Sequence, residues 1–347
     1  MRLKYLLVYI LPITVCFSFS ESGLWTFSPV ILFFVILPII ELFIKPDTKN
    51  FDEKTERIEG SNKMYDWIVF LAVPVQLFVF IYFLHVIDNS PVNSVEFLGK
   101  ISSMGFMCGV LGINIGHELG HRRNKVEKFL GEILLLTSLD THFHIYHNEM
   151  HHRDVATPRD PATAKRDQLL YLFWITSHFG SYIKAWKIEN HRMKKANKSV
   201  LSLNNRMIVY SIANIFLLVT IYHFFNLIVL LAFIAAAIIG IILLETVNYI
   251  EHYGLLRKRS EEGDYERVRH CHSWNSDHQL GRMLLFNLSR HSDHHYNGGK
   301  KYQILLSHSD SPQMPTGYPG MMVLAVLQPF WFLLMNRKLD QLVQNAE

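Results

Sequence analysis

Histidine is the residue type in this chain whose number and spacing can support chemistry. The 347 residues include 19 histidines, and many of these lie in short clusters. Imidazole nitrogens bind transition metals, so histidines that recur at helical spacing indicate a metal site. Three clusters and one lone histidine supply nine candidate ligands, too many for one metal ion, and therefore predict a dinuclear site: His117, His121, His147, His151, His152, His252, His291, His294 and His295.

The spacing within each cluster predicts which imidazoles share a helix face. The first cluster has i, i+4 spacing, which places both imidazoles on one side of an α-helix. In the second, His147 and His151 share a face and His152 lies about 100° further round, so one segment can serve two metal ions. The third cluster has i, i+3, i+4 spacing, and His252 stands alone in the segment Asn-Tyr-Ile-Glu-His-Tyr-Gly.

The first cluster also reads His-Glu-x-x-His, the motif of zinc proteases. In that motif two histidines bind zinc and the glutamate, here Glu118, acts as the general base. An intramembrane zinc protease is therefore a competing interpretation. Such a protease needs one further ligand, so this interpretation would leave six clustered histidines without a role.

The ligand type narrows the choice of metal. The three cysteines, Cys16, Cys108 and Cys271, form no CxxC pair, which argues against an iron–sulfur or rubredoxin centre within this chain. Neutral imidazole suits iron, copper, zinc and nickel, but zinc has no redox chemistry. We expect two non-haem iron ions, which can accept electrons and use O₂ as a co-substrate. A histidine-rich ligand set distinguishes such a site from the carboxylate-rich one of soluble diiron bundles.

Long apolar runs must position these histidines. Half of the residues are hydrophobic and 18% are charged, against roughly 25% charged in soluble domains. Because about 20 apolar residues cross a bilayer, we expect an all-α integral membrane protein with six transmembrane helices in three hairpins, as a single domain over residues 1–347. The predicted spans lie near residues 5–19, 24–44, 67–87, 97–115, 207–223 and 226–246.

The distribution of basic residues predicts the orientation of these spans. Lys and Arg are frequent in residues 45–63, 122–206 and 257–301 and absent from the connections 20–23, 88–94 and 223–226. The positive-inside rule therefore places both termini in the cytoplasm. Residues 117–206 and 252–347 then form a cytoplasmic helical cap that holds the dinuclear iron site. The predicted location is the cell inner (cytoplasmic) membrane, with the active site on its cytoplasmic side.

Two segments leave alternatives for this topology. Residues 1–20 also have the pattern of a signal peptide, and its removal would leave five spans with the same orientation. Residues 318–335 are apolar and aromatic, but a seventh span would move the C-terminus outside. We therefore interpret them as an interfacial or core-packed helix. The small net charge of +4 gives no indication of nucleic-acid binding.

Around the histidine clusters the sequence resembles the membrane-bound alkane 1-monooxygenase (alkane hydroxylase) family, within the histidine-box membrane desaturase and hydroxylase superfamily. The resemblance extends from about residue 24 to residue 340. Its densest segments are residues 117–121, 142–143, 147–148, 151–152, 155–158, 160–162, 248–254, 272–276, 290–295, 302–303 and 312–320. Arg122, Tyr146, Ser289 and Tyr296 depart from the commoner family pattern of Lys, Glu, Gln and Ala, and none of these departures removes a ligand.

The resemblance implies a six-helix enzyme that inserts one oxygen atom of O₂ into a terminal C–H bond. Its substrates would be medium-chain n-alkanes drawn from the membrane lipid, and its products 1-alcohols. Electrons would come from rubredoxin, with rubredoxin reductase and NADH upstream. The resemblance also implies that the nine histidines named above are the iron ligands and the catalytic residues.

Polar residues beside these ligands are candidate partners for the ligand N–H groups. They are Glu118, Glu251, Asp293, His142 and His272. His270 is equally ambiguous. We interpret the other histidines as ordinary surface or core residues: His85, His144, His178, His191, His223, His278 and His308. Basic residues at 257–259 and 300–301 either dock an acidic electron carrier or simply follow the positive-inside rule.

Other functions are compatible with parts of this pattern. Desaturation, epoxidation, or hydroxylation of a fatty acyl or alkyl-aromatic substrate could use the same metal site. A metal transporter or sensor would need polar residues along a path through the membrane. The middles of the predicted spans are almost wholly apolar, which argues against that class.

Overall fold

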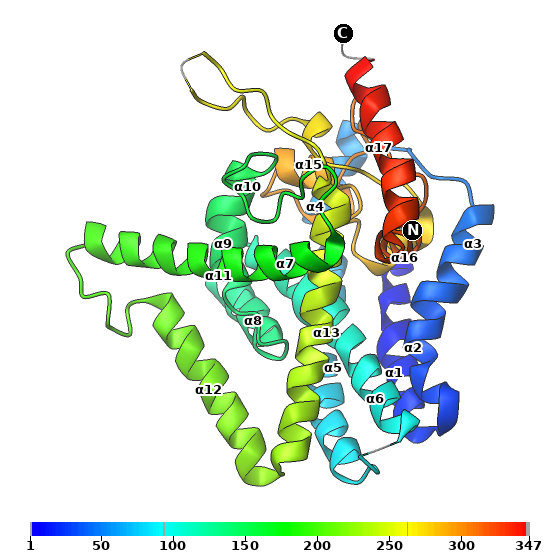
Figure 1. The fold of residues 1–347 in the computed structure, drawn as a ribbon, viewed down its shortest axis with the longest axis vertical. Helices are drawn as coiled ribbons and strands as arrows, with labels where there is room; N and C mark the ends of the chain where they lie inside the picture. Colours follow the sequence, from blue (N-terminus) through cyan, green and yellow to red (C-terminus); the bar gives the residue numbers. More distant parts are fainter. Residues whose placement is uncertain (1, 93, 262, 345–347) are drawn as a thin grey trace.

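The computed structural model describes residues 2–92, 94–261 and 263–344, and its regular structure is helical apart from two isolated β-bridges (Figure 1). Within these residues, six helical segments are long and apolar enough to cross a membrane. The predicted fold class is therefore confirmed. The segments are Arg2–Ser20, Gly23–Phe43, Lys63–Asp88, Val95–Gly120, Arg206–Phe224 and Leu227–His252.

Most of the six segments extend beyond the apolar runs that predicted them. The segment Arg2–Ser20 consists of a 3₁₀-helix and α1 (Ile10–Ser20), and Gly23–Phe43 includes α2 (Ser28–Ile31) and α3 (Leu37–Phe43). The others are α5 (Lys63–Asp88), α6 (Val95–Met107) continuing into α7 (Ile115–Gly120), α12 (Arg206–Phe224) and α13 (Leu227–His252). Because the polar ends of α7 and α13 remain helical, both helices carry histidines out of the apolar region.

Lipid-facing and core-facing sides can be distinguished along the spans. Ile212, Ile215, Phe216 and Val219 of α12 are exposed, and this helix diverges from α13 along most of its length in Figure 1. Apolar side chains directed outward on a long helix are typical of contact with lipid. By contrast, Tyr5 of the first segment is buried, stacks on Phe286 and accepts a hydrogen bond from Asn287.

Glycines allow the fourth and sixth spans to approach closely. A Cβ on Gly240 of α13 would lie 2.6 Å from Cys108 Cβ and 3.0 Å from the backbone nitrogen of Gly109. A Cβ on Gly105 would lie 2.4 Å from a side-chain carbon of Ile239. Small residues permit such backbone contact between membrane helices. This contact holds the span that bears His117 beside the span that bears His252.

Shorter helices and loops form the polar end of the bundle. They include α4 (Glu53–Ser61), α8 (Lys125–Leu136), α9 (Phe143–Tyr146), α10 (His152–Asp154), α14 (Gln279–Leu284) and α15 (His291–Tyr296). Helix α11 (Leu170–Lys195) runs across the spans rather than along them (Figure 1). Its exposed Leu172, Ile175, Phe179 and Ile183 form an apolar face, which is typical of a helix that lies in a membrane surface.

The C-terminal apolar segment is broken where the sequence suggested one helix. Helices α16 (Tyr318–Val326) and α17 (Gln328–Gln344) meet at an angle of 120°. Tyr318, Met321 and Trp331 are buried in a cluster with Tyr249 of α13. Residues 318–335 therefore pack against the protein core.

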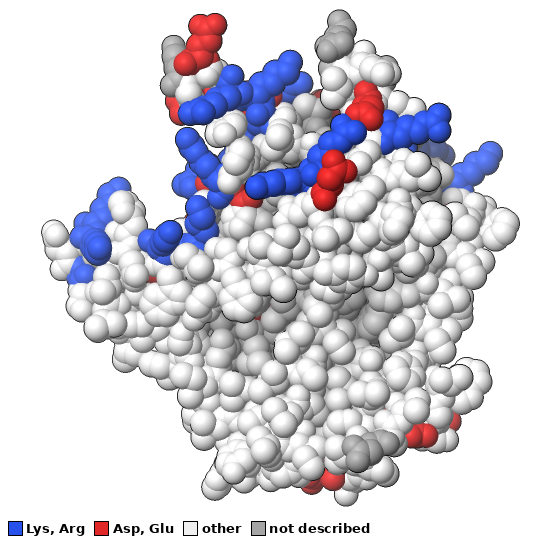
Figure 2. Space-filling view, in the orientation of Figure 1, with Lys and Arg blue, Asp and Glu red and all other residues white. Residues whose placement is uncertain are grey.

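Charge is segregated between the two ends of the molecule. In the view of Figure 2, Lys and Arg side chains gather at the end that carries the short helices and loops. The opposite end shows acidic but no basic side chains in that view. A broad uncharged surface separates the two ends, as expected of a surface that faces lipid.

Candidate metal centre

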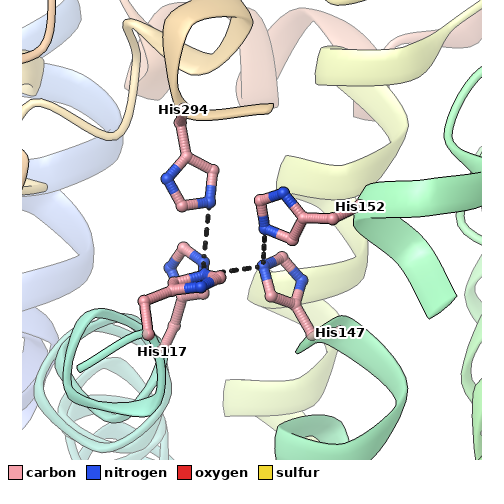
Figure 3. Close-up of side chains that lie close together, drawn as sticks. His117, His147, His152 and His294 are labelled. Atoms are coloured by element: carbon pink, nitrogen blue, oxygen red, sulfur yellow. Dashed lines mark hydrogen bonds between the residues drawn. The ribbon is translucent and has the colours of Figure 1, made fainter. Parts of the chain in front are cut away.

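Five histidines from three parts of the chain converge in one group, here called the five-histidine group: His117, His121, His147, His152 and His294. Figure 3 shows four of them directed toward one another. The Nε2 of His117 lies 2.9 Å from that of His121 and 3.1 Å from that of His294. The Nε2 of His147 lies 3.2 Å from that of His121 and 2.9 Å from that of His152.

A π-helical turn determines which histidines of the second cluster belong to the five-histidine group. His147–His151 is a π-helix, and the backbone N–H of His152 bonds to the carbonyl of His147, five residues earlier. In this wider turn the residues five apart share a side. His147 therefore joins His152. The pairing expected from α-helical spacing, His147 with His151, was wrong, because that expectation assumed 3.6 residues per turn.

The other four histidines form a second group, here called the four-histidine group: His151, His252, His291 and His295. The Nε2 of His291 lies 3.1 Å from that of His252 and 2.9 Å from that of His295. All four side chains are buried. The structure thus divides the nine predicted residues into two adjacent groups, each with ligand atoms within 4.8 Å of one another.

The chemistry of these nitrogens fits metal ions. A neutral imidazole has only one N–H donor, so a ring of Nε2 atoms about 3 Å apart cannot satisfy itself with hydrogen bonds. Burial, together with the neighbouring histidines, holds the pKa of His147, His291 and His295 well below the usual range. Their lone pairs are therefore available. A cation bound within either group would satisfy these lone pairs.

A carboxylate outside the predicted set positions one ligand. Asp160 Oδ2 lies 3.0 Å from Nδ1 of His151, which leaves Nε2 of His151 to face the group without a hydrogen-bond partner. Tyr146 and Thr163 donate hydrogen bonds to Asp160. Burial opposes ionisation of Asp160, but His151 and the hydrogen bonds of Thr163 and Tyr146 lower its pKa to about 2. Asp160 therefore fixes the tautomer and the direction of the His151 ring.

Glu251 occupies a different place relative to its histidine. Its Oε2 lies 3.1 Å from Nε2 of His291, the nitrogen that faces the four-histidine group, while Nδ1 of His291 has no hydrogen-bond partner. The other carboxylate oxygen, Oε1, is buried without a partner. Glu251 therefore stands beside the metal-facing nitrogen and can offer an oxygen to a bound cation.

The remaining candidate partners contact residues other than the nine histidines. Glu118 pairs with Arg122 at 2.8 Å, so it is not held as a base beside the metal position. Asp293 accepts from the backbone of Leu306 at 2.8 Å and lies 3.1 Å from His308. His272 accepts from the backbone of Arg269 and lies 3.4 Å from Glu266.

His142 lies in a separate cluster with Asp140 and His178, two residues that the sequence did not single out as functional. Spacing alone did not suggest them, because Asp140 and His178 come together only through the packing of α11. Asp160 was present only as part of a family motif, and its position nine residues after His151 gave no sign of contact.

An apolar cavity ends at the two histidine groups. His117, His147, His291 and Glu251 line one part of it. The rest is lined mainly by apolar side chains, among them Phe33, Phe34, Phe106, Leu284 and Met322. Phe143 and Asn248 also reach the cavity. A hydrocarbon could therefore lie in the membrane-embedded part with one end beside the metal positions.

Comparisons with known proteins agree with this geometry. The fatty acid desaturase family matches residues 96–325. The chain is 36% identical to alkane 1-monooxygenase 1 of Alcanivorax borkumensis, over 92% of this chain and 80% of that protein. It is also 36% identical to alkane 1-monooxygenase 1 of Pseudomonas aeruginosa, over 92% and 84%. The xylene/toluene monooxygenase hydroxylase component of Pseudomonas putida is 27% identical, over 96% and 88%.

Proposed function

Because the chain belongs to the fatty acid desaturase superfamily and, within it, to the alkane 1-monooxygenases, a family of membrane oxidoreductases, we propose that it hydroxylates medium-chain n-alkanes at the terminal carbon. The products are 1-alcohols, O₂ is the co-substrate, and rubredoxin supplies the electrons. The observation that carries this proposal is the apolar cavity that ends on histidines of both groups.

The lining of the cavity favours an uncharged substrate. Its polar residues are Asn114, Asn248, Glu251 and the three histidines, and the described lining residues include no Lys or Arg. A carboxylate substrate would find no cation there, and burying an unpaired charge is costly. An n-alkane, in contrast, buries its whole surface at roughly 25 cal/mol per Å². The cavity thus supports alkanes over free fatty acids.

Iron is the metal that this chemistry requires. The nine histidines are the proposed ligands, five for one iron and four for the other, and Glu251 can add an oxygen to the second set. When bound, the two irons supply the redox chemistry that activates O₂. The chain contributes positioning: Asp160 orients His151, the π-helical turn distributes the second cluster, and the apolar walls exclude water from the reacting end of the substrate.

The end of the molecule that is rich in Lys and Arg suggests both the membrane orientation and where an electron carrier would dock. We propose that the basic end seen in Figure 2 faces the cytoplasm at the inner membrane, as the positive-inside rule favours. Several basic residues predicted to dock a carrier are held by the protein itself: Lys301 pairs with Asp66, Lys300 with Glu56 and Asp293, and Arg257 is buried. Of the predicted set, Lys258 and Arg259 are exposed and remain for an acidic rubredoxin.

Reconstitution tests the proposal directly. The protein is purified in lipid nanodiscs, its iron is counted, and octane is supplied with rubredoxin, rubredoxin reductase, NADH and O₂. About two irons per chain and formation of 1-octanol are expected. His252→Ala should lose one iron and the formation of 1-octanol, whereas His191→Ala, a control at an exposed position of α11, should keep both.

Parallel substrates define the outcomes that contradict the proposal. Palmitate and p-xylene are assayed under the same conditions, since one relative is named for xylene and toluene. Two irons with turnover of p-xylene or palmitate but not octane would refute the alkane assignment and keep the metal site. Bound zinc with no O₂ uptake would refute both.

A further inference from the structure

A second cluster of metal-binding side chains lies outside the nine histidines. Asp140 and His142 come from the turn between α8 and α9, and His178 comes from α11. The Nδ1 of His142 lies 3.1 Å from Asp140 Oδ1, and the Nδ1 of His178 lies 4.0 Å from the same oxygen. All three ligand atoms lie within 4.8 Å of one another.

Hydrogen bonds on the far side of His142 determine which nitrogen faces this cluster. The hydroxyl of Ser181 donates to the carbonyl of His178 at 2.7 Å. It can therefore only accept from Nε2–H of His142, which lies 3.1 Å away. A neutral imidazole with its proton on Nε2 presents a lone pair at Nδ1. That lone pair faces the carboxylate of Asp140, so either a proton or a metal cation must lie between them.

The carboxylate of Asp140 is otherwise unsatisfied. Its side chain is 1% exposed, and neither oxygen has a hydrogen-bond partner despite the proximity of His142. The Nδ1 of His178 is likewise buried without a partner. Burial, then the nearby charge of Glu245, raises the pKa of Asp140 well above its ordinary value. An isolated buried carboxylate is strongly destabilising, and a single proton on Asp140 would leave His178 unpaired.

We propose that Asp140, His142 and His178 bind a third metal ion, a divalent transition-metal ion such as Zn²⁺. One carboxylate oxygen and two imidazole nitrogens are a common three-residue zinc set, with water as the fourth ligand. Ligand atoms around a tetrahedral zinc lie ~3.3 Å apart, so His142 is already in place and His178 needs a small rotation. The hydrogen bond of His142 to Ser181 is the outer contact that a metal-bound histidine usually makes.

The position of the site gives the ion a structural role. His142 lies five residues before His147, so the ion would tie α11 to the segment that enters the five-histidine group. The side chain of His178 is 24% exposed, which leaves the site an approach for the ion. The bound ion would thus fix the position of the second histidine cluster relative to α11, a helix that lies along the membrane surface.

Metal counting on the iron-loaded, tag-free protein tests this site. The protein is equilibrated with micromolar Zn²⁺, freed of excess metal, and analysed for iron and zinc separately. One zinc per chain is expected in the wild type. His178→Ala should bind zinc at least about tenfold more weakly with its iron unchanged, whereas His191→Ala on the same helix should keep the zinc.

A second variant and a stability measurement guard against misfolding. Asp140→Asn retains the size of the side chain and should also lose the zinc. Zinc should raise the melting temperature of the wild type and of His191→Ala, but not that of His178→Ala or Asp140→Asn. Absence of zinc from the wild type would overturn the site. Unchanged zinc binding in folded His178→Ala and Asp140→Asn would overturn it as well. Because iron is counted separately, this outcome is distinct from failure of the proposed hydroxylase function.

Discussion

The two histidine groups differ in the residues that surround them. The four-histidine group is wholly buried and has two carboxylates in contact, Asp160 with His151 and Glu251 with His291. In the five-histidine group, His121 and His152 are partly exposed. Among the described residues, no carboxylate makes an ion pair or hydrogen bond with any of its five members.

Two sites with nearly identical ligands can therefore differ in the burial of the ligands and in the carboxylates that contact them. Carboxylates in contact with ligands raise ligand basicity and offset the charge of a bound cation. A buried site gains more from such charges, because the surrounding dielectric is low. We therefore expect the four-histidine group to depend on its carboxylates, and the five-histidine group, which has one more imidazole, to tolerate the loss of one ligand.

The largest expected effect is the loss of a ligand from the smaller group. His252→Ala leaves three imidazoles there, so one iron should be lost and octane hydroxylation should fall by more than roughly 100-fold. His121→Ala leaves four imidazoles in the other group, enough to hold an ion. Its iron content should remain nearer two. Metal analysis and 1-octanol formation check this, and equal iron loss in both variants would remove the distinction between the groups.

Removal of the Asp160 charge comes next in size. Asp160→Asn keeps the shape of the side chain but weakens the support of His151, so activity or iron affinity should fall by roughly 10–100-fold. Tyr146→Phe keeps the charge and removes one hydrogen bond, so its effect should be smaller. Competition with an iron chelator measures both variants. An Asp160→Asn enzyme with wild-type affinity would show that the carboxylate is not needed.

Acid should reveal the same carboxylate in the metal-free protein. The folded-state pKa of Asp160 is about 2, whereas an unfolded aspartate has a pKa of about 3.9. The stabilisation is therefore complete above about pH 4 and is lost as the pH falls toward 2. Melting temperatures of chelator-stripped wild type and Asp160→Asn should differ by a constant amount above about pH 5 and converge below it. A constant difference down to about pH 3 would contradict this.

The smallest effect on the metal is expected for Glu118→Gln. Glu118 contacts Arg122, which also pairs with Asp66 at 2.9 Å, so the change should lower stability by roughly 1–3 kcal/mol and leave iron content unchanged. Iron analysis and a melting curve test this. His252→Ala serves as the metal-losing control. Loss of iron in Glu118→Gln would show that this glutamate contributes to the metal site and would favour the zinc-protease interpretation.

Much of this architecture follows from local sequence. The lengths of the apolar runs predicted six spans, because the width of a bilayer and the rise of a helix are both constant. The i, i+4 spacing of the first cluster predicted one shared face, and the structure places His117 and His121 in one group. Both inferences depend only on regular helix geometry, which a sequence pattern carries by itself.

The division of the nine histidines into two groups, and the carboxylates that contact them, depend on the tertiary structure. Because residues 147–151 form a π-helical turn, His147 lies on the same side as His152 and not on that of His151. The pattern of apolar residues does not specify where a helix adopts such a wider turn. Glu118 forms an ion pair with Arg122, and Asp160 contacts His151. Such pairings depend on packing between segments distant in sequence, because a buried charge takes whichever partner the fold brings within reach.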